Sequence, residues 1–197
     1  LDARYGNLPN ATPDECERMI ANERIAAAKT IQELSPEPAL TDLFLLQTDV
    51  HNLKILLKAR MLGGGGEIAW QEGGLYARET LANAVANAQY DCLPEKLKES
   101  LDRMENRLKV HFEPQIVSIA CDRGYLAHAM TTVESVREPF AKQYFSALCD
   151  FDNVLTFLRM RAMGASREDL RETLLPMGGI PPQALITSDD ERRPYET

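Results

Sequence analysis

The chain contains the stretch Asp49-Val50-His51-Asn52-Leu53-Lys54-Ile55-Leu56-Leu57-Lys58-Ala59-Arg60-Met61-Leu62-Gly63, and a related copy follows 101 residues later (150 − 49). The copy is Asp150-Phe151-Asp152-Asn153-Val154-Leu155-Thr156-Phe157-Leu158-Arg159-Met160-Arg161-Ala162-Met163-Gly164. An Asp, an Asn, a Leu, an Arg and the final Gly are identical in the two copies. Self-similarity at a fixed spacing indicates that one structural unit was duplicated. The sequence therefore predicts two repeats of a helical unit.

Three polar residues of this stretch fall on the apolar side of the helix that it predicts. At about 100° per residue, Asp49, Asn52 and Arg60 lie on the same face as the leucines. Buried polar groups need hydrogen-bond partners. Asp49 and Arg60 would be roughly 16 Å apart along a helix, so we expect their partners to come from neighbouring helices.

We interpret the residues shared by both copies as framework that fixes how the helices pack. Catalytic sites are rarely duplicated, whereas the framework of a repeat is; a polar site in a pocket is the alternative. Gly63 and Gly164 stand where a helix end favours a left-handed residue. The predicted structural motif consists of Asp49, Asn52, Leu57, Arg60, Gly63, Asp150, Asn153, Leu158, Arg161 and Gly164.

The rest of the chain predicts helices and no strand, because nothing alternates with a period of two. A capping box with Pro13 at the first helical position starts one helix, and a second capping box starts at Ser166. We expect the helix after Ile116 to be interrupted or to end near Gly124. The expected helices cover residues 12–34, 38–62, 75–90, 94–112, 116–130, 132 or 139 to 163, and 166–175. The predicted fold is all-α, with duplicated helical subdomains.

A second pair of matching segments follows the duplicated stretch. The tripeptides at 73–75 and 178–180, Gly-Gly-Leu and Gly-Gly-Ile, correspond at a shift of 105 residues (178 − 73). We attribute the difference from 101 to four extra residues in the first copy, at Gly63–Gly66. We assign residues 1–82 to the first helical repeat and residues 83–197 to the second.

Composition bounds the class of function. The 197 residues carry 30 acidic and 22 basic side chains, a formal net charge of −8, which argues against nucleic-acid binding and favours basic protein partners. The four cysteines are scattered, as expected of reduced thiols in a cytoplasmic protein. No apolar run reaches the roughly 20 residues that cross a bilayer, and no signal peptide is visible. Any work at a membrane would then depend on other proteins.

Two segments invite a catalytic interpretation. Gly63–Gly66 is not followed by the Gly-Lys-Ser/Thr of a phosphate-binding loop and no strand precedes it, so we interpret it as a connection between helices. A metal site could be assembled from His111, Cys121, Asp122 and His128, although their spacing matches no zinc pattern. We predict no catalytic residue, no cofactor and no metal, and a small helical metalloenzyme using His111, His128 and Cys121 stays as an alternative.

The duplicated pattern, D-x-x-N-L/V-x-x-L/F-L-x-x-R-x-x-G, resembles the C subunit of bacterial and archaeal V-type (A-type) ATP synthases, to which the d subunit of eukaryotic proton pumps is similar. The segment from Asp49 to Arg60 carries the closest resemblance. The resemblance implies an all-helical funnel of three such repeats, of which this chain would cover about two. Its motif residues would then be framework within each repeat.

The resemblance also implies a function. Members of that family seat the central shaft on the membrane rotor ring and couple ATP hydrolysis or synthesis to proton or sodium transport. The implied partners are the central-shaft subunits of the soluble head and the membrane rotor ring, and the implied location is cytoplasmic and peripheral to the membrane. An unrelated helical-repeat adaptor that binds another partner remains the alternative.

Overall fold

The computed structural model describes residues 12–64, 69–110 and 113–190. These residues form helices and no strand, which confirms the predicted all-α class for this part of the chain. The helices are α1 (Pro13–Leu34), α2 (Pro38–Met61), α3 (Arg78–Asn87), α4 (Glu95–Leu108), α5 (Pro114–Val136), α6 (Pro139–Ala162), α7 (Arg167–Thr173) and α8 (Pro182–Asp190).

The helix starts reproduce the duplication. Pro13 and Pro114, the first residues of α1 and α5, are 101 residues apart (114 − 13), and so are Pro38 and Pro139 at the starts of α2 and α6 (139 − 38). Proline is favoured at a first helical position, because its missing N–H would have no partner there. The pair α5–α6 therefore repeats the pair α1–α2 without an insertion.

Capping boxes fix two of the helix starts, as the sequence predicts. The Thr12 hydroxyl accepts a hydrogen bond from the Glu15 N–H while the Glu15 carboxylate accepts one from the Thr12 N–H. Ser166 and Asp169 make the same reciprocal pair at α7. Each pair satisfies backbone N–H groups that the helix itself leaves free.

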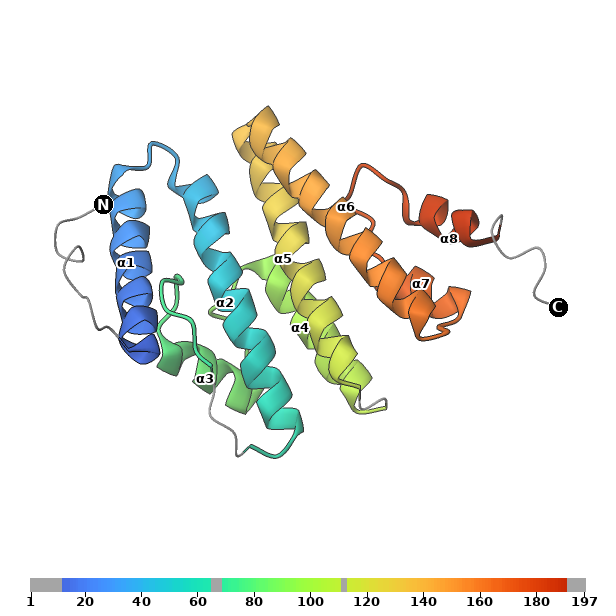
Figure 1. Ribbon diagram of the computed structural model, residues 1–197, viewed down its shortest axis with the longest axis horizontal. Helices are drawn as coiled ribbons and strands as arrows, with labels where there is room; N and C mark the ends of the chain where they lie inside the picture. Colours follow the sequence, from blue (N-terminus) through green and yellow to red (C-terminus); the bar gives the residue numbers. More distant parts are fainter. Residues whose placement is uncertain (1–11, 65–68, 111–112, 191–197) are drawn as a thin grey trace.

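Four long helices lie in one layer in the order α1, α2, α5, α6 (Figure 1). Helix α5 packs against α2 on one side and α6 on the other, and α4 packs along α5. The main core lies between these helices, where Leu53, Leu57, Leu97, Leu101 and Phe145 are fully buried. A second, smaller core joins α6 to α7 and α8 through Phe157, Met160, Leu170, Leu174 and Ile186.

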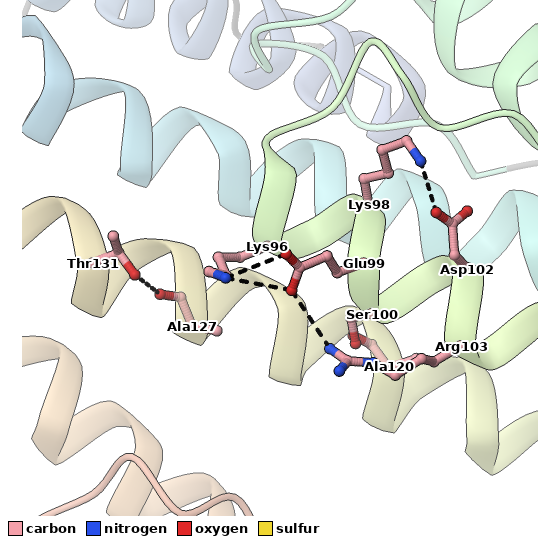
Figure 2. Close-up of polar contacts among 9 residues, drawn as sticks. All are labelled: Lys96, Lys98, Glu99, Ser100, Asp102, Arg103, Ala120, Ala127 and Thr131. Carbon is pink, nitrogen blue, oxygen red and sulfur yellow. Dashed lines mark hydrogen bonds and ion pairs between the residues drawn. The ribbon is translucent and has the colours of Figure 1, made fainter.

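Helix α5 is continuous through Gly124, so the expected interruption there is wrong. A Cβ at Gly124 would lie 2.9 Å from the Cα of Leu97 and 2.9 Å from the Cβ of Ser100. The glycine therefore serves the close approach of α4 to α5, which a pattern within one helix does not reveal. The Ser100 hydroxyl donates to the Ala120 carbonyl across the same contact, at 2.8 Å (Figure 2).

The opposite face of α4 carries charges of alternating sign. Lys98 pairs with Asp102 at 2.8 Å, and Glu99 lies between Lys96 and Arg103 (Figure 2). Leu97, Leu101 and Met104 are buried on the inner face. Helix α4 is therefore amphipathic and packs on neighbouring helices with its apolar face.

Candidate functional site

Asp49 is buried in the middle of α2 and holds the loop that leads to α3. Its carboxylate accepts hydrogen bonds from the backbone N–H groups of Leu75, at 2.7 Å, and Tyr76, at 3.3 Å. A Cβ on Gly74 would lie 2.1 Å from Asp49 Oδ1, so only glycine lets the loop come this close. These bonds hold residues 75–76 in the loop, and α3 begins at Arg78 instead of at Leu75 as predicted.

Asn52 holds the same loop one helical turn further along α2. Its Nδ2 donates to the Gln71 carbonyl at 2.8 Å, and its Oδ1 accepts from the Gln71 N–H at 2.9 Å. The side chain is buried, so both polar groups of the amide and both backbone groups of Gln71 are satisfied inside the protein. Asp49 and Asn52 together form what we call the first loop clamp.

Asp150 and Asn153 form a second loop clamp on α6 with the same chemistry. Asp150 accepts from the N–H groups of Gly179, at 3.0 Å, and Ile180, at 2.8 Å. Asn153 donates to the Leu175 carbonyl and accepts from the Leu175 N–H, both at 2.8 Å. A Cβ on Gly178 would lie 1.9 Å from Asp150 Oδ1. The duplicated sequence motif is therefore a duplicated structure.

The clamps correct two expectations. The structural register of the loops is 104 residues, from Gln71 to Leu175 (175 − 71) and from Leu75 to Gly179 (179 − 75), not 105. Because 104 exceeds 101, the second connection is the longer one, by three residues; we expected four extra residues in the first. Helix α3 and helix α8 also begin 104 residues apart, at Arg78 and Pro182.

The partners of the clamp residues are also different from those expected. Asp49 binds the backbone of a loop and not a neighbouring helix as expected, and Asn52 binds the same loop. A helical wheel shows which side chains turn inward, but a loop without periodicity gives no signal of its own path. The expectation holds for Arg60, which donates to the Val85 carbonyl of α3 at 2.5 Å and to Glu105 of α4 at 2.6 Å. The Tyr90 hydroxyl also donates to Glu105.

The remaining motif positions can be compared between the two copies, and some pairs have the same conformation and burial while others do not. Gly63 and Gly164 both adopt the left-handed conformation after a helix end, with φ of 82° and 73°. Arg161 occupies on α6 the place of Arg60 on α2 and is half-buried. Leu57 is fully buried, whereas 53% of the Leu158 side chain is exposed.

Burial changes the electrostatics of the first clamp. It raises the pKa of Asp49 to about 6, against the opposing effect of the hydrogen bonds from Leu75 and Tyr76. A carboxyl group with such a pKa can be catalytic when a substrate reaches it. Asp49 is fully covered by the loop that it binds, so the geometry supports a structural role.

Among the described residues of the metal-site alternative, Cys121, Asp122 and His128, the structure shows no metal-binding group. Cys121 is buried among apolar side chains, which raises the pKa of its thiol to about 12, and Asp122 pairs with Lys54 of α2 at 2.5 Å. Burial lowers the pKa of His128. His111 lies outside the described residues. Within residues 12–64, 69–110 and 113–190, no three His, Cys, Asp or Glu side chains are placed to hold a metal ion.

A cleft of about 450 Å³ between α4, α5, α6 and α7 contains arginines that the sequence analysis did not single out. Arg107 pairs with Glu172 at 2.9 Å, and Arg123 donates to the carbonyls of Glu172 and Leu174. Burial, together with Arg103 and Arg107, lowers the pKa of Arg123. Arg103 and Arg107 lie on α4 and Arg123 lies on α5, so no single motif marks the three, and their chemistry suits an anionic group.

The chain that carries these duplicated clamps is similar to known proteins. The family model described as ATP synthase (C/AC39) subunit matches residues 2–191. The chain belongs to this family. The C/AC39 chain is also 23% identical over 171 residues to the C subunit of the V-type sodium ATPase of Enterococcus hirae. That match covers 87% of this chain and 52% of the relative, so the chain spans about half the length of the curated relative it matches.

No solved structure matches this C/AC39 chain significantly. Family membership confirms the resemblance drawn from the duplicated stretch and removes the alternative of an unrelated helical adaptor. In the part of the chain that the structure describes, none of the helices has both the length and the apolar character needed to cross a bilayer.

Proposed function

We propose that this chain is a non-catalytic connector in the central stalk of a V-type (A-type) ATP synthase. It would seat the shaft of the soluble head on the membrane rotor ring and couple ATP hydrolysis or synthesis to proton or sodium transport. Membership in the ATP synthase (C/AC39) family is the observation behind the proposal. The similar protein of Enterococcus hirae is named as part of a sodium ATPase, which is consistent with a role inside such a complex.

The loop clamps support a mechanical role. A connector that transmits torque has to resist deformation, and close packing with satisfied buried polar groups supplies that resistance. Asp49 and Asn52 tie one long helix to its following loop, and Asp150 and Asn153 do the same in the second repeat. The net charge of −8 favours a basic partner, which suits an acidic socket for a basic shaft.

The proposed function also implies a location for the protein and a role without bound cofactor or metal. We place it on the cytoplasmic side, held at the membrane by the shaft and the rotor ring, without a cofactor or a metal of its own. The repeats proposed as the units of this connector are residues 1–82 and 83–197.

Variants that weaken the two loop clamps, studied in the assembled complex, test this function. Asn52→Ala combined with Asn153→Ala removes one arm of each clamp, and we expect ATP-driven ion uptake into vesicles to fall much more than ATP hydrolysis by the same complex. Asn87→Ala is the matched control, because Asn87 is exposed and its side chain donates to the Asn83 carbonyl of its own helix. An equal loss of hydrolysis and transport would instead indicate a role in catalysis.

Binding to the shaft is the second measurement. The purified chain should co-elute with the proteins of the shaft at low salt and less at high salt, because screening weakens contacts between opposite charges. The absence of co-elution at low salt, while the folded chain is intact by circular dichroism, contradicts the proposed acidic socket.

A further inference from the structure

The cleft between α4, α5, α6 and α7 combines positive charge with apolar walls. Its volume of about 450 Å³ is within the range of pockets that hold small organic molecules. The charge comes from Arg103, Arg107 and Arg123. The apolar walls consist of one side chain of α4, two of α5, one of α6 and one just beyond α6: Met104, Ile116, Ile119, Met160 and Met163. The cleft therefore suits a molecule that is charged at one end and apolar at the other.

Arg123 has a hydrogen-bond donor that the described residues leave without a partner. Its Nη2 donates to the carbonyls of Glu172, at 2.9 Å, and Leu174, at 3.4 Å, where α7 ends. Its Nε is buried and, in the part of the chain that the structure describes, bonds to no acceptor. A buried donor without an acceptor is unfavourable, and an ion or ligand beside it is one arrangement that satisfies it.

The charges around Arg123 favour an anion. Arg107 pairs with Glu172 at 2.9 Å, so these two charges offset each other. Arg103 lies 3.9 Å from Glu99, and its side chain is 71% exposed (Figure 2). Burial lowers the pKa of Arg123, the charges of Arg103 and Arg107 lower it further, and Glu172 opposes this shift. An anion beside Arg123 would supply the negative charge that these groups lack.

Two further carboxylates line the cleft, and neither occupies the position beside Arg123. Asp169 accepts hydrogen bonds from the N–H and the hydroxyl of Ser166 in the capping box of α7. Glu113 precedes Arg123 by ten residues (123 − 113) at the start of α5, roughly 15 Å along the helix. The cleft thus has an anion-accepting end at Arg123 and an apolar section towards the start of α5.

We propose that this cleft binds a small organic anion, with a phosphate or carboxylate group at Arg123 and an apolar body against the isoleucines and methionines. A guanidinium binds the oxygens of such a group through parallel N–H donors, and Nε–H is the donor that remains available. Arg103 and Arg107, one helical turn apart on α4, add positive charge at the same end. The site goes beyond the connector function and does not depend on it, because it needs only residues of this chain.

Titration of the isotope-labelled chain with hexyl phosphate, followed by the amide chemical shifts in NMR spectra, tests the proposal. We expect saturable shifts at residues that line the cleft, such as Ala120 and Thr173. Hexanoate places a carboxylate on a similar apolar body, and the tighter of the two ligands identifies the preferred anionic group. Inorganic phosphate should bind more weakly because it lacks the apolar body, and hexylammonium should not bind because its charge is positive.

Variants of the arginines locate the anionic end. Arg123→Met should weaken the binding of hexyl phosphate by about tenfold or more, because it removes a charged donor. Arg123 also holds the end of α7, so Arg103→Gln is a second variant, at an exposed side chain. It should weaken binding by about threefold and keep the wild-type melting temperature. Arg18→Gln is the matched control, because Arg18 is exposed on α1 and does not line the cleft; it should bind as the wild type does.

Several results would overturn the proposal. The site does not exist if neither hexyl phosphate nor hexanoate shifts the amides of the cleft. Binding of hexylammonium as tight as that of hexyl phosphate, or wild-type affinity in both Arg103→Gln and Arg123→Met, would show that the arginines do not select an anion. Equal affinities for inorganic phosphate and hexyl phosphate would show that the apolar walls take no part. A loss in Arg18→Gln equal to that in Arg103→Gln would reduce the effect to the net charge of the chain.

Discussion

Helices α2 and α6 have the same motif and the same loop clamp, but they differ in what covers them. Asn52 and Asn153 each bind both backbone groups of one loop residue, at distances of 2.8–2.9 Å. Further along each helix, Leu57 is fully buried and Leu158 is 53% exposed. The clamp is therefore internal to each repeat, whereas the burial of the leucine differs between the repeats. Identical residues in two copies can thus contribute very different free energies of folding.

The largest expected difference is at the paired leucines. Leu57→Ala should lower the free energy of unfolding by about 4 kcal/mol, because it leaves a cavity in a packed core. Leu158→Ala should change it by less than about 0.5 kcal/mol, because most of that side chain is already in water. Urea denaturation at low protein concentration measures both. Equal losses would show that the two leucines have similar surroundings.

The paired asparagines should behave alike. Asn52→Ala and Asn153→Ala each leave a backbone N–H and a backbone carbonyl without their partner, at a cost of about 3 kcal/mol in the free energy of unfolding. Asn87→Ala, at an exposed position, should cost less than about 0.5 kcal/mol. If one clamp variant loses as little free energy of unfolding as this control, the two clamps are not equivalent.

The smallest expected effect depends on pH and concerns the first clamp. Burial raises the pKa of Asp49 from 3.8 to about 6, so between these pH values the folded protein binds more protons than the unfolded one. The stability contributed by Asp49 is therefore fully present below about pH 4 and falls as the pH rises to about 6. Relative to Asp49→Asn, the wild-type chain should lose about 2 kcal/mol between pH 4 and pH 7.

Urea denaturation at several pH values, with Asp150→Asn measured beside Asp49→Asn, locates this effect in the first copy or in both. A difference between the wild type and Asp49→Asn that stays constant with pH would show that the Asp49 carboxyl titrates normally.

Several features could be predicted because they depend on residues close together in the chain. The capping boxes at Thr12 and Ser166, the helical class and the inward turn of Asn52 each follow from a local pattern. The role of Gly124 could not be predicted, because the Leu97 backbone that requires it belongs to another helix. The register of the clamped loops also differs by one residue from the prediction, because adjacent glycines match at either shift.

The sequence alone determined that the chain is helical, that one unit occurs twice, and which polar residues turn inward, because helical periodicity and duplication are properties of the chain itself. Only the tertiary structure decided that Asp49 and Asn52 hold a loop, and that Leu57 on α2 is covered while Leu158 on α6 is exposed. The physical reason is that hydrogen-bond partners and burial depend on which segments meet in space, and the two corresponding helices meet different neighbours.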